Sequence, residues 1–173
     1  MLKSVKYLFF VLFLIPLLTL TIVSCDSDDS SDDDDTGAGD DTPEYFIKVK
    51  IDGVETTFEG GFTEAGSKPV ASYDADDDQS SIYAFSPSVS YGSMDSGNGL
   101  MFTDIEGKTT GSFTCNVMYY NDGTTSAATN CKIDISAYGA EGEAVTGSMP
   151  TGFVAGGKTF TDCTFNVYNS GDE

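Results

Sequence analysis

After residue 44, hydrophobic and polar residues alternate in short runs that are separated by glycine, asparagine, aspartate or proline. Alternation with a period of two is typical of a β-strand with one buried face. No stretch of this region has the spacing of an amphipathic helix. The pattern therefore predicts an all-β domain over residues 45–173.

The clearest local signal lies at the start of this domain. Two alternating runs, 45–51 and 54–58, are separated by Asp52-Gly53, which favours a type I′ turn and a β-hairpin. Many short strands with turn residues between them are typical of a β-sandwich or barrel. The expected form is an antiparallel β-sandwich of the Ig-like or jelly-roll-like kind. Further strands are expected at 69–73, 81–86, 89–91, 100–104, 111–120, 131–138, 144–154 (broken around Pro150) and 159–168.

The first 24 residues have the composition of an export signal. Lys3 and Lys6 precede an apolar run at 7–20, and the small residue Ser24 stands directly before Cys25. A basic start, an apolar core and a small residue at the cut are the marks of a secretory signal peptide. One alternative is an uncleaved transmembrane anchor, for which the apolar run is barely long enough. Another is an ordinary cleaved signal without lipid.

The residues Ile22-Val23-Ser24-Cys25 resemble the lipobox of bacterial lipoproteins: an aliphatic residue, a tolerant position, a small residue and then the modified cysteine. The resemblance implies cleavage after Ser24 and lipidation of Cys25, so that residues 1–24 are a lipoprotein signal peptide. It also implies a protein that is lipid-anchored at the bacterial outer membrane or cell surface. Two or more acyl chains give a stable anchor.

Residues 25–44 predict a disordered, extended tether. After Cys25 this segment is dominated by aspartate, serine and glycine, so it buries little and its like charges repel one another. A spacer between membrane and domain is the simplest interpretation. Ser27-Asp28-Asp29 also resembles the acidic signals that send some Gram-negative lipoproteins to the cell surface. Asp26 resembles an inner-membrane retention signal of other lineages.

The composition excludes several kinds of chemistry. The chain has 173 residues and a formal net charge of -20, and it contains no histidine, arginine or tryptophan. Without histidine there is no Ser-His-Asp triad, no Cys-His pair and no histidine-ligated metal site. A strongly acidic surface repels nucleic acid, and it also repels anionic headgroups, so the lipid must supply the membrane affinity.

Three cysteines remain if Cys25 carries lipid. Cys115, Cys131 and Cys163 fall on the apolar faces of their expected strands, and an oxidising compartment permits one disulfide. A turn near Gly123 places Cys115 opposite Cys131. The similar runs 129–135 and 161–167 leave a Cys131–Cys163 bond open, and three buried thiols are the third alternative.

Acidic residues supply the other candidate sites. Asp74, Asp76 and Asp78 resemble the start of a Ca²⁺ loop but lack the glycine and distal glutamate of an EF-hand, so a solvated turn is expected and Ca²⁺ is at most a weak ligand. The pairs Asp104/Glu106 and Glu141/Glu143 flank turns. Paired carboxylates can hydrolyse glycosides when they face one cleft. No cofactor is otherwise expected.

The hairpin at 47–58, the Gly-x-Phe strand at 111–113 and the last strand, which rises from a glycine-rich turn at 156–168, accompany the lipobox. Together they resemble small β-sandwich lipoproteins of unknown function, which implies a fold and a compartment but no activity. The expected function is a non-enzymatic binding or structural module at the cell envelope, with a surface protein complex or a glycan as partner. The alternatives are a carboxylate- or Ca²⁺-dependent hydrolase, and a surface spacer or antigen without a specific ligand.

Overall fold

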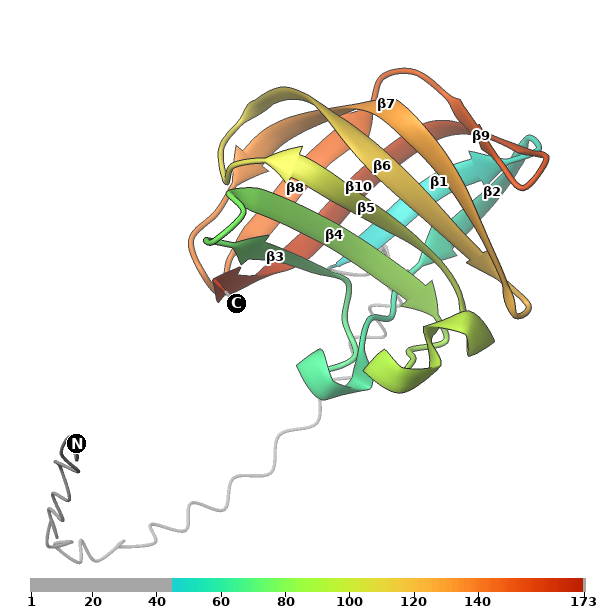
Figure 1. Cartoon of the computed structure of the whole chain (residues 1–173), viewed down its shortest axis with the longest axis horizontal. Helices are drawn as coiled ribbons and strands as arrows, with labels where there is room; N and C mark the ends of the chain where they lie inside the picture. The colour runs from blue at the N-terminus through green and yellow to red at the C-terminus, as the bar shows by residue number, and fades with distance from the viewer. Residues whose placement is uncertain (1–44, 173) are drawn as a thin grey trace, which may run out of the picture. The chain divides into compact units, whose positions relative to one another are not determined.

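The computed structural model describes residues 45–172 (Figure 1). The predicted signal peptide, the acidic tether, Ser24 and Cys25 lie outside these residues. No helix within the described range is long and apolar enough to cross a membrane. The elements are β1 (Phe46–Ile51), β2 (Val54–Phe58), η1 (Thr63–Ala65), β3 (Val70–Asp74), β4 (Gln79–Ser86), η2 (Tyr91–Ser96), β5 (Asn98–Glu106), β6 (Gly111–Asn121), β7 (Thr124–Tyr138), β8 (Ala144–Met149), β9 (Phe153–Ala155) and β10 (Lys158–Asp172).

Seven of these strands close into a ring in the order β10–β3–β4–β5–β6–β7–β8, because β10 pairs with β8 as well as with β3. Strand β10 is 15 residues long and therefore reaches four neighbours. It pairs with β1 and β3 along one edge, and with β9 and β8 along the other. The β3–β10 pair is parallel, whereas the other pairs of the ring are antiparallel. The domain is thus a mixed β-barrel with β1, β2 and β9 as additional strands.

The all-β prediction is confirmed, but the antiparallel sandwich is corrected to a closed, mixed barrel. Alternation decides only which side chains point inward, and it is the same in both architectures. Closure depends instead on β8, which pairs with two strands along the same residues. Gly147 lies opposite both Ile135 of β7 and Phe165 of β10.

Most expected strands are found, and the largest differences lie at 89–91 and at the start of β7. Asp52 and Gly53 have φ values of 51° and 84°, as a type I′ turn requires, and the hairpin forms as predicted. The region around Pro150 separates β8 from β9. The strand expected at 89–91 is wrong, because Val89 makes one isolated bridge to Phe62 and η2 follows. Strand β7 begins at Thr124, earlier than expected, because its polar first half pairs with β6.

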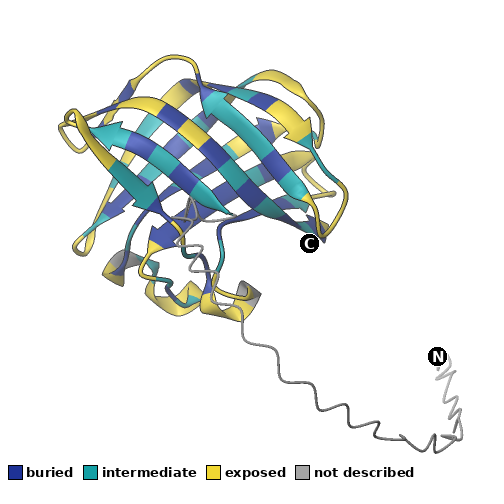
Figure 2. Ribbon diagram, turned by 180° about the vertical axis from the view of Figure 1, so that it is seen from behind, coloured by how far each residue is buried: buried dark blue, intermediate teal, exposed yellow. Residues whose placement is uncertain are grey.

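Two hydrophobic clusters lie on opposite faces of the sheet. The larger fills the barrel and includes Phe102, Phe160 and Ile133. The smaller lies outside the barrel and contains Phe62 and Phe85. Buried and exposed positions alternate along the strands (Figure 2). The segments that carry η1 and η2 thus cover part of the outer face, which the alternating pattern alone does not reveal.

Candidate functional site

The wall of the barrel opens between β5 and β6. Their pairing ends at Thr103 and Asn116, although β5 continues to Glu106 and β6 begins at Gly111. Asp104 has a φ of 60° at the point of divergence, and its carboxylate accepts a hydrogen bond from the side-chain amide of Asn116. An open cleft of about 570 Å³ lies at this place.

The strands beside the opening keep their other partners. Strand β4 pairs with β5 as far as Gln79 and Glu106, and β7 pairs with β6 as far as Ile135 and Gly111. The opening therefore removes only the ladder between β5 and β6. The barrel remains closed around it, so the cleft is a local feature of an otherwise paired wall.

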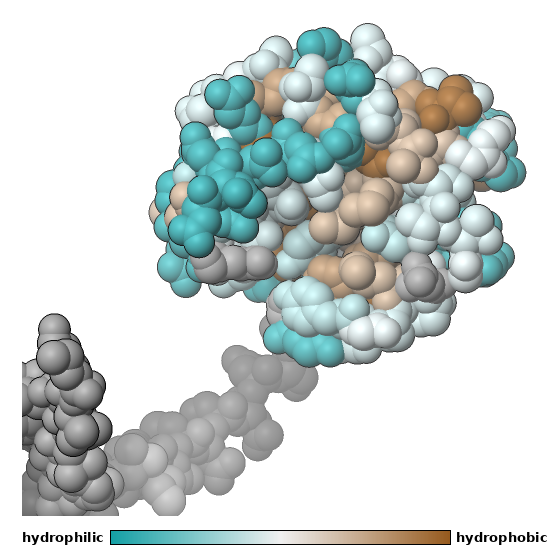
Figure 3. All heavy atoms as spheres, in the orientation of Figure 1, coloured by the Kyte–Doolittle hydropathy of each residue, from teal (hydrophilic) through white to brown (hydrophobic). Residues whose placement is uncertain are grey.

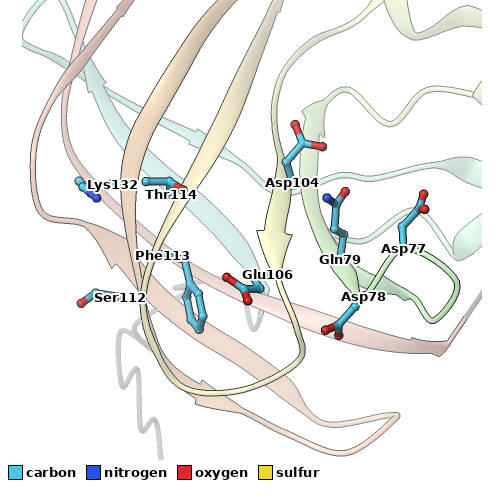
Figure 4. Close-up of a pocket in the computed structure, with 9 residues that line it drawn as sticks. All are labelled: Asp77, Asp78, Gln79, Asp104, Glu106, Ser112, Phe113, Thr114 and Lys132. Carbon is cyan, nitrogen blue, oxygen red and sulfur yellow. The ribbon is translucent and has the colours of Figure 1, made fainter.

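Polar and charged side chains line this opening, which we call the acidic cleft. It holds four carboxylates and a single ammonium group, and a half-buried phenylalanine ring is the one large apolar group. In Figure 4 the ring of Phe113 and the carboxylate of Glu106 lie between two rows of polar residues. Hydrophilic residues also gather at this end of the barrel in Figure 3. The lining residues are Asp77, Asp78, Gln79, Asp104, Glu106, Ser112, Phe113, Thr114 and Lys132.

Hydrogen bonds connect the β3–β4 turn to the β5–β6 turn at one side of the cleft. The backbone N–H of Gly107 donates to the carbonyl of Asp78 at 2.8 Å, and the hydroxyl of Ser80 donates to the carbonyl of Gly107 at 2.6 Å. The hydroxyl of Tyr73 donates to Asp78 Oδ1 at 2.7 Å, and this bond raises the pKa of Tyr73. The carboxylates of this rim are thus carried on linked backbone segments.

The predicted Ca²⁺ candidates are not brought together as one ligand set. Asp74 Oδ1 accepts the backbone N–H groups of Asp76 at 2.9 Å and Asp77 at 3.3 Å, which is the hydrogen bonding of an Asx turn. Asp78 is bonded to Tyr73 instead. Within residues 45–172, no three acidic or cysteine side chains are grouped closely enough to hold a metal ion.

A second hollow of about 490 Å³ includes Lys108, Tyr138, Glu141 and Asp172 among its lining residues. Its cation is already engaged, because Lys108 Nζ lies 2.8 and 3.0 Å from the two carboxylate oxygens of Asp172. Glu141 lines this hollow, whereas the Glu143 carboxylate accepts the backbone N–H of Ala140 at 2.9 Å. The second hollow therefore offers little free charge to a ligand.

Cys115 and Cys131 lie directly opposite each other on β6 and β7, as the hairpin argument predicts. Together with Cys163 they belong to the core inside the barrel, and all three are free thiols in this structure. Burial raises the pKa of Cys115 and Cys163 to about 12 and raises that of Cys131. Thiols in this state are poor nucleophiles, so the folded core does not present a reactive cysteine.

The sequence anticipated only part of the acidic cleft. Asp104 and Glu106 were expected as a pair of carboxylates beside a turn and Asp78 as a weak Ca²⁺ candidate, and all three line it. Gln79, Thr114 and Lys132 come from three other places in the chain and were missed. None of these three residues was itself a candidate, because their proximity depends on where the β5–β6 ladder stops.

The resemblance to lipoproteins rests on the lipobox and on weak motifs of the domain. Cys25 and its surroundings lie outside residues 45–172, so lipidation stays a prediction, as does the binding function. A comparison of this chain with protein-family models, with curated proteins and with solved structures finds no match.

Proposed function

We propose that this chain is a lipid-anchored protein of the bacterial outer membrane or cell surface whose barrel is a non-enzymatic binding module. The acidic cleft binds a cationic group, and the partner is a surface protein that offers lysine or arginine side chains. The observation that carries this proposal is the cleft lining, which contains four carboxylates and one ammonium group.

Electrostatics favours a cation as the ligand. Clefts lined by one sign of charge concentrate the field and raise the local concentration of the opposite charge. The chain as a whole has a formal net charge of -20, so the long-range field of the protein also attracts cations. Because the acidic residues of the cleft are exposed, each contact is screened by water and salt. The interaction is therefore weak and sensitive to ionic strength.

A neutral glycan is a poorer fit than a basic protein segment. Sugars bind through hydrogen bonds and through stacking on an exposed aromatic face, and the only ring in the lining, Phe113, is half-buried. A neutral ligand also gains nothing from four negative charges. The exposure of the cleft carboxylates also disfavours hydrolysis, because a carboxyl group that acts as a general acid is normally shielded from water.

Removing two charges from the cleft should weaken binding of a basic peptide. Fluorescence anisotropy with a labelled hexalysine peptide at low salt measures the dissociation constant. The double variant Asp104→Asn/Glu106→Gln should raise it roughly tenfold, because two exposed charge pairs contribute about 1.4 kcal/mol together. Asparagine also tolerates the left-handed backbone at position 104.

The matched control removes the same charge elsewhere. Asp122 and Glu59 are exposed and do not line the acidic cleft, and the double variant Asp122→Asn/Glu59→Gln should change the dissociation constant by less than about twofold. Equal losses in both variants would show diffuse attraction and would contradict the proposal. Cleft-dependent binding of maltohexaose, or release of new reducing ends from it, would replace the proposal with a glycan-binding or hydrolytic function.

Replacing Cys25 with serine should release the protein from membranes or leave the precursor uncut, because lipid is attached to the cysteine sulfur and processing follows lipidation in lipobox proteins. The measurement is fractionation of cells followed by mass determination of the chain. A matched Cys163→Ser variant should stay in the membrane fraction. A Cys25→Ser chain of mature size in that fraction would show that the anchor is not at Cys25.

A further inference from the structure

Two cysteines of the core occupy positions that suit a covalent bond. Cys115 and Cys131 are register partners in the β6–β7 pair, and both side chains belong to the interior cluster. Directly opposite residues of an antiparallel pair have Cα atoms about 4.5–5.5 Å apart. A disulfide requires about 4.4–6.8 Å between Cα atoms, so the usual spacing of such a pair falls within the required range.

The third cysteine is placed differently. Strand β8 lies between β7 and β10, because Ser148 pairs with Asp134 on one side and Thr164 on the other. Cys131 of β7 and Cys163 of β10 are therefore separated by two strand spacings, about 9.5 Å, and by a further offset of two residues along the strands. Cα atoms more than about 7 Å apart cannot be bridged without moving the backbone. This arrangement removes the Cys131–Cys163 bond from the alternatives.

We propose that Cys115 and Cys131 form a cross-strand disulfide while the chain folds under oxidising conditions, and that Cys163 stays a thiol. The bond links β6 to β7 beside the bulge at Asn130, where φ is 57° and the register between the two strands shifts. It therefore cross-links the two strands of the hairpin beside the bulge.

The bond must form before the barrel closes. In the folded domain Cys115 and Cys131 are only 2% and 9% exposed, so an oxidant has little access to either sulfur. Burial also raises the pKa of Cys115 from 9.0 to about 12, which lowers its thiolate fraction roughly a thousandfold. In the unfolded chain an oxidant can reach both sulfur atoms, and burial does not raise the pKa of either thiol.

The reaction needs a disulfide donor, such as oxidised glutathione in solution or a thiol–disulfide oxidoreductase in the envelope. The thiolate of one cysteine attacks a donor sulfur, breaks the donor's S–S bond and releases one donor thiol. The second cysteine then attacks the first, forms the protein disulfide and releases the second donor thiol. Two electrons and two protons pass from the cysteine pair to the donor.

Peptide mapping separates the possible outcomes, because the lysines divide the cysteines conveniently. Cleavage after Lys108, Lys132 and Lys158 gives a peptide 109–132 with both Cys115 and Cys131, and a peptide 159–173 with Cys163. The full chain is exported from a bacterium, unfolded with N-ethylmaleimide and without reductant, and digested with trypsin. We expect peptide 109–132 to carry no maleimide and to be lighter by two hydrogen atoms, while peptide 159–173 carries one maleimide.

Two results would overturn the proposal. Maleimide on all three cysteines would show that no bond forms, and a link between the two peptides would show that Cys163 takes part. The Cys163→Ala chain should keep the bond, whereas Cys131→Ala should leave Cys115 fully alkylated. Both are read in unfolded protein, so a loss of stability does not obscure them.

The order of events has its own test. Oxidised glutathione is added either during refolding of the reduced chain or after refolding is complete. Bond formation should be at least ~100-fold slower in the second case, because the thiols are buried and protonated. Equal rates would contradict formation before closure.

Discussion

Replacing Phe160 with alanine should lower the free energy of unfolding by about 3–5 kcal/mol, the usual loss for truncating a fully buried phenylalanine. Phe160 is 0% exposed and pairs with Ile51 on one side and Phe153 on the other. Its ring is stacked on Phe153 with 4.5 Å between the ring centroids, and it meets Tyr119 edge-on at 4.9 Å. Alanine would leave a cavity where four strands meet, because the surrounding sheet cannot collapse into it.

Urea denaturation followed by circular dichroism measures this loss. Because native domains are stable by about 5–15 kcal/mol, this loss removes a large part of the stability and should lower the urea midpoint clearly. Val154→Ala is the control, since Val154 is a strand residue of β9 that is 60% exposed, and it should cost less than about 0.5 kcal/mol. A loss of under about 1 kcal/mol in Phe160→Ala would mean that this side chain is not packed as described.

Adding one methyl group at Gly147 should destabilise the barrel by about 3 kcal/mol, at the upper end for overpacking. A Cβ atom at this position would lie 2.2 Å from the carbonyl oxygen of Asp134 and 2.4 Å from Cζ of Phe165. The first neighbour is backbone and cannot turn away, so β8 must separate from β7. The substitution therefore acts on the strand that closes the ring.

Gly92→Ala is the matched control, because a Cβ atom there meets nothing within 4 Å. It should leave the free energy of unfolding unchanged within about 0.5 kcal/mol. Hydrogen exchange of the amides in β8 adds a local measurement, and exchange should accelerate there first in Gly147→Ala. If both glycine variants are equally stable, the close approach of β8 and β7 is wrong.

The binding and stability predictions test different parts of the molecule. Asp104→Asn/Glu106→Gln changes exposed side chains at a place where the β5–β6 ladder has already ended, so it should alter peptide affinity with little loss of stability. Phe160→Ala should lower the stability and leave the peptide affinity of the folded domain nearly unchanged. Finding this separation would support an acidic cleft that the barrel carries but does not need for its own stability.

Local chemistry determined much of the strand pattern. The type I′ turn at Asp52-Gly53 requires residues that accept a positive φ. Such a pair between two alternating runs is a strong signal of a hairpin. A straight count from the turn at Asp122-Gly123 would place Cys115 opposite Asn130, and the bulge at Asn130 brings Cys131 opposite Cys115 instead. The type I′ turn depends on neighbours in the chain, which is why the sequence by itself determined it, whereas the bulge that pairs the two cysteines became visible only in the structure.

Only the tertiary structure decided the closure and the cleft. Whether β10 meets β8 depends on partners more than 10 residues away, and an inward-facing residue looks the same in a sandwich and in a barrel. The stretch 89–91 has the composition of a strand, yet a single bridge to Phe62 and the turn into η2 use its backbone. Asp104 and Lys132 share the acidic cleft because a ladder stops at Thr103. The left-handed backbone of Asp104 marks that point, and the alternating pattern of β5 and β6 does not predict it.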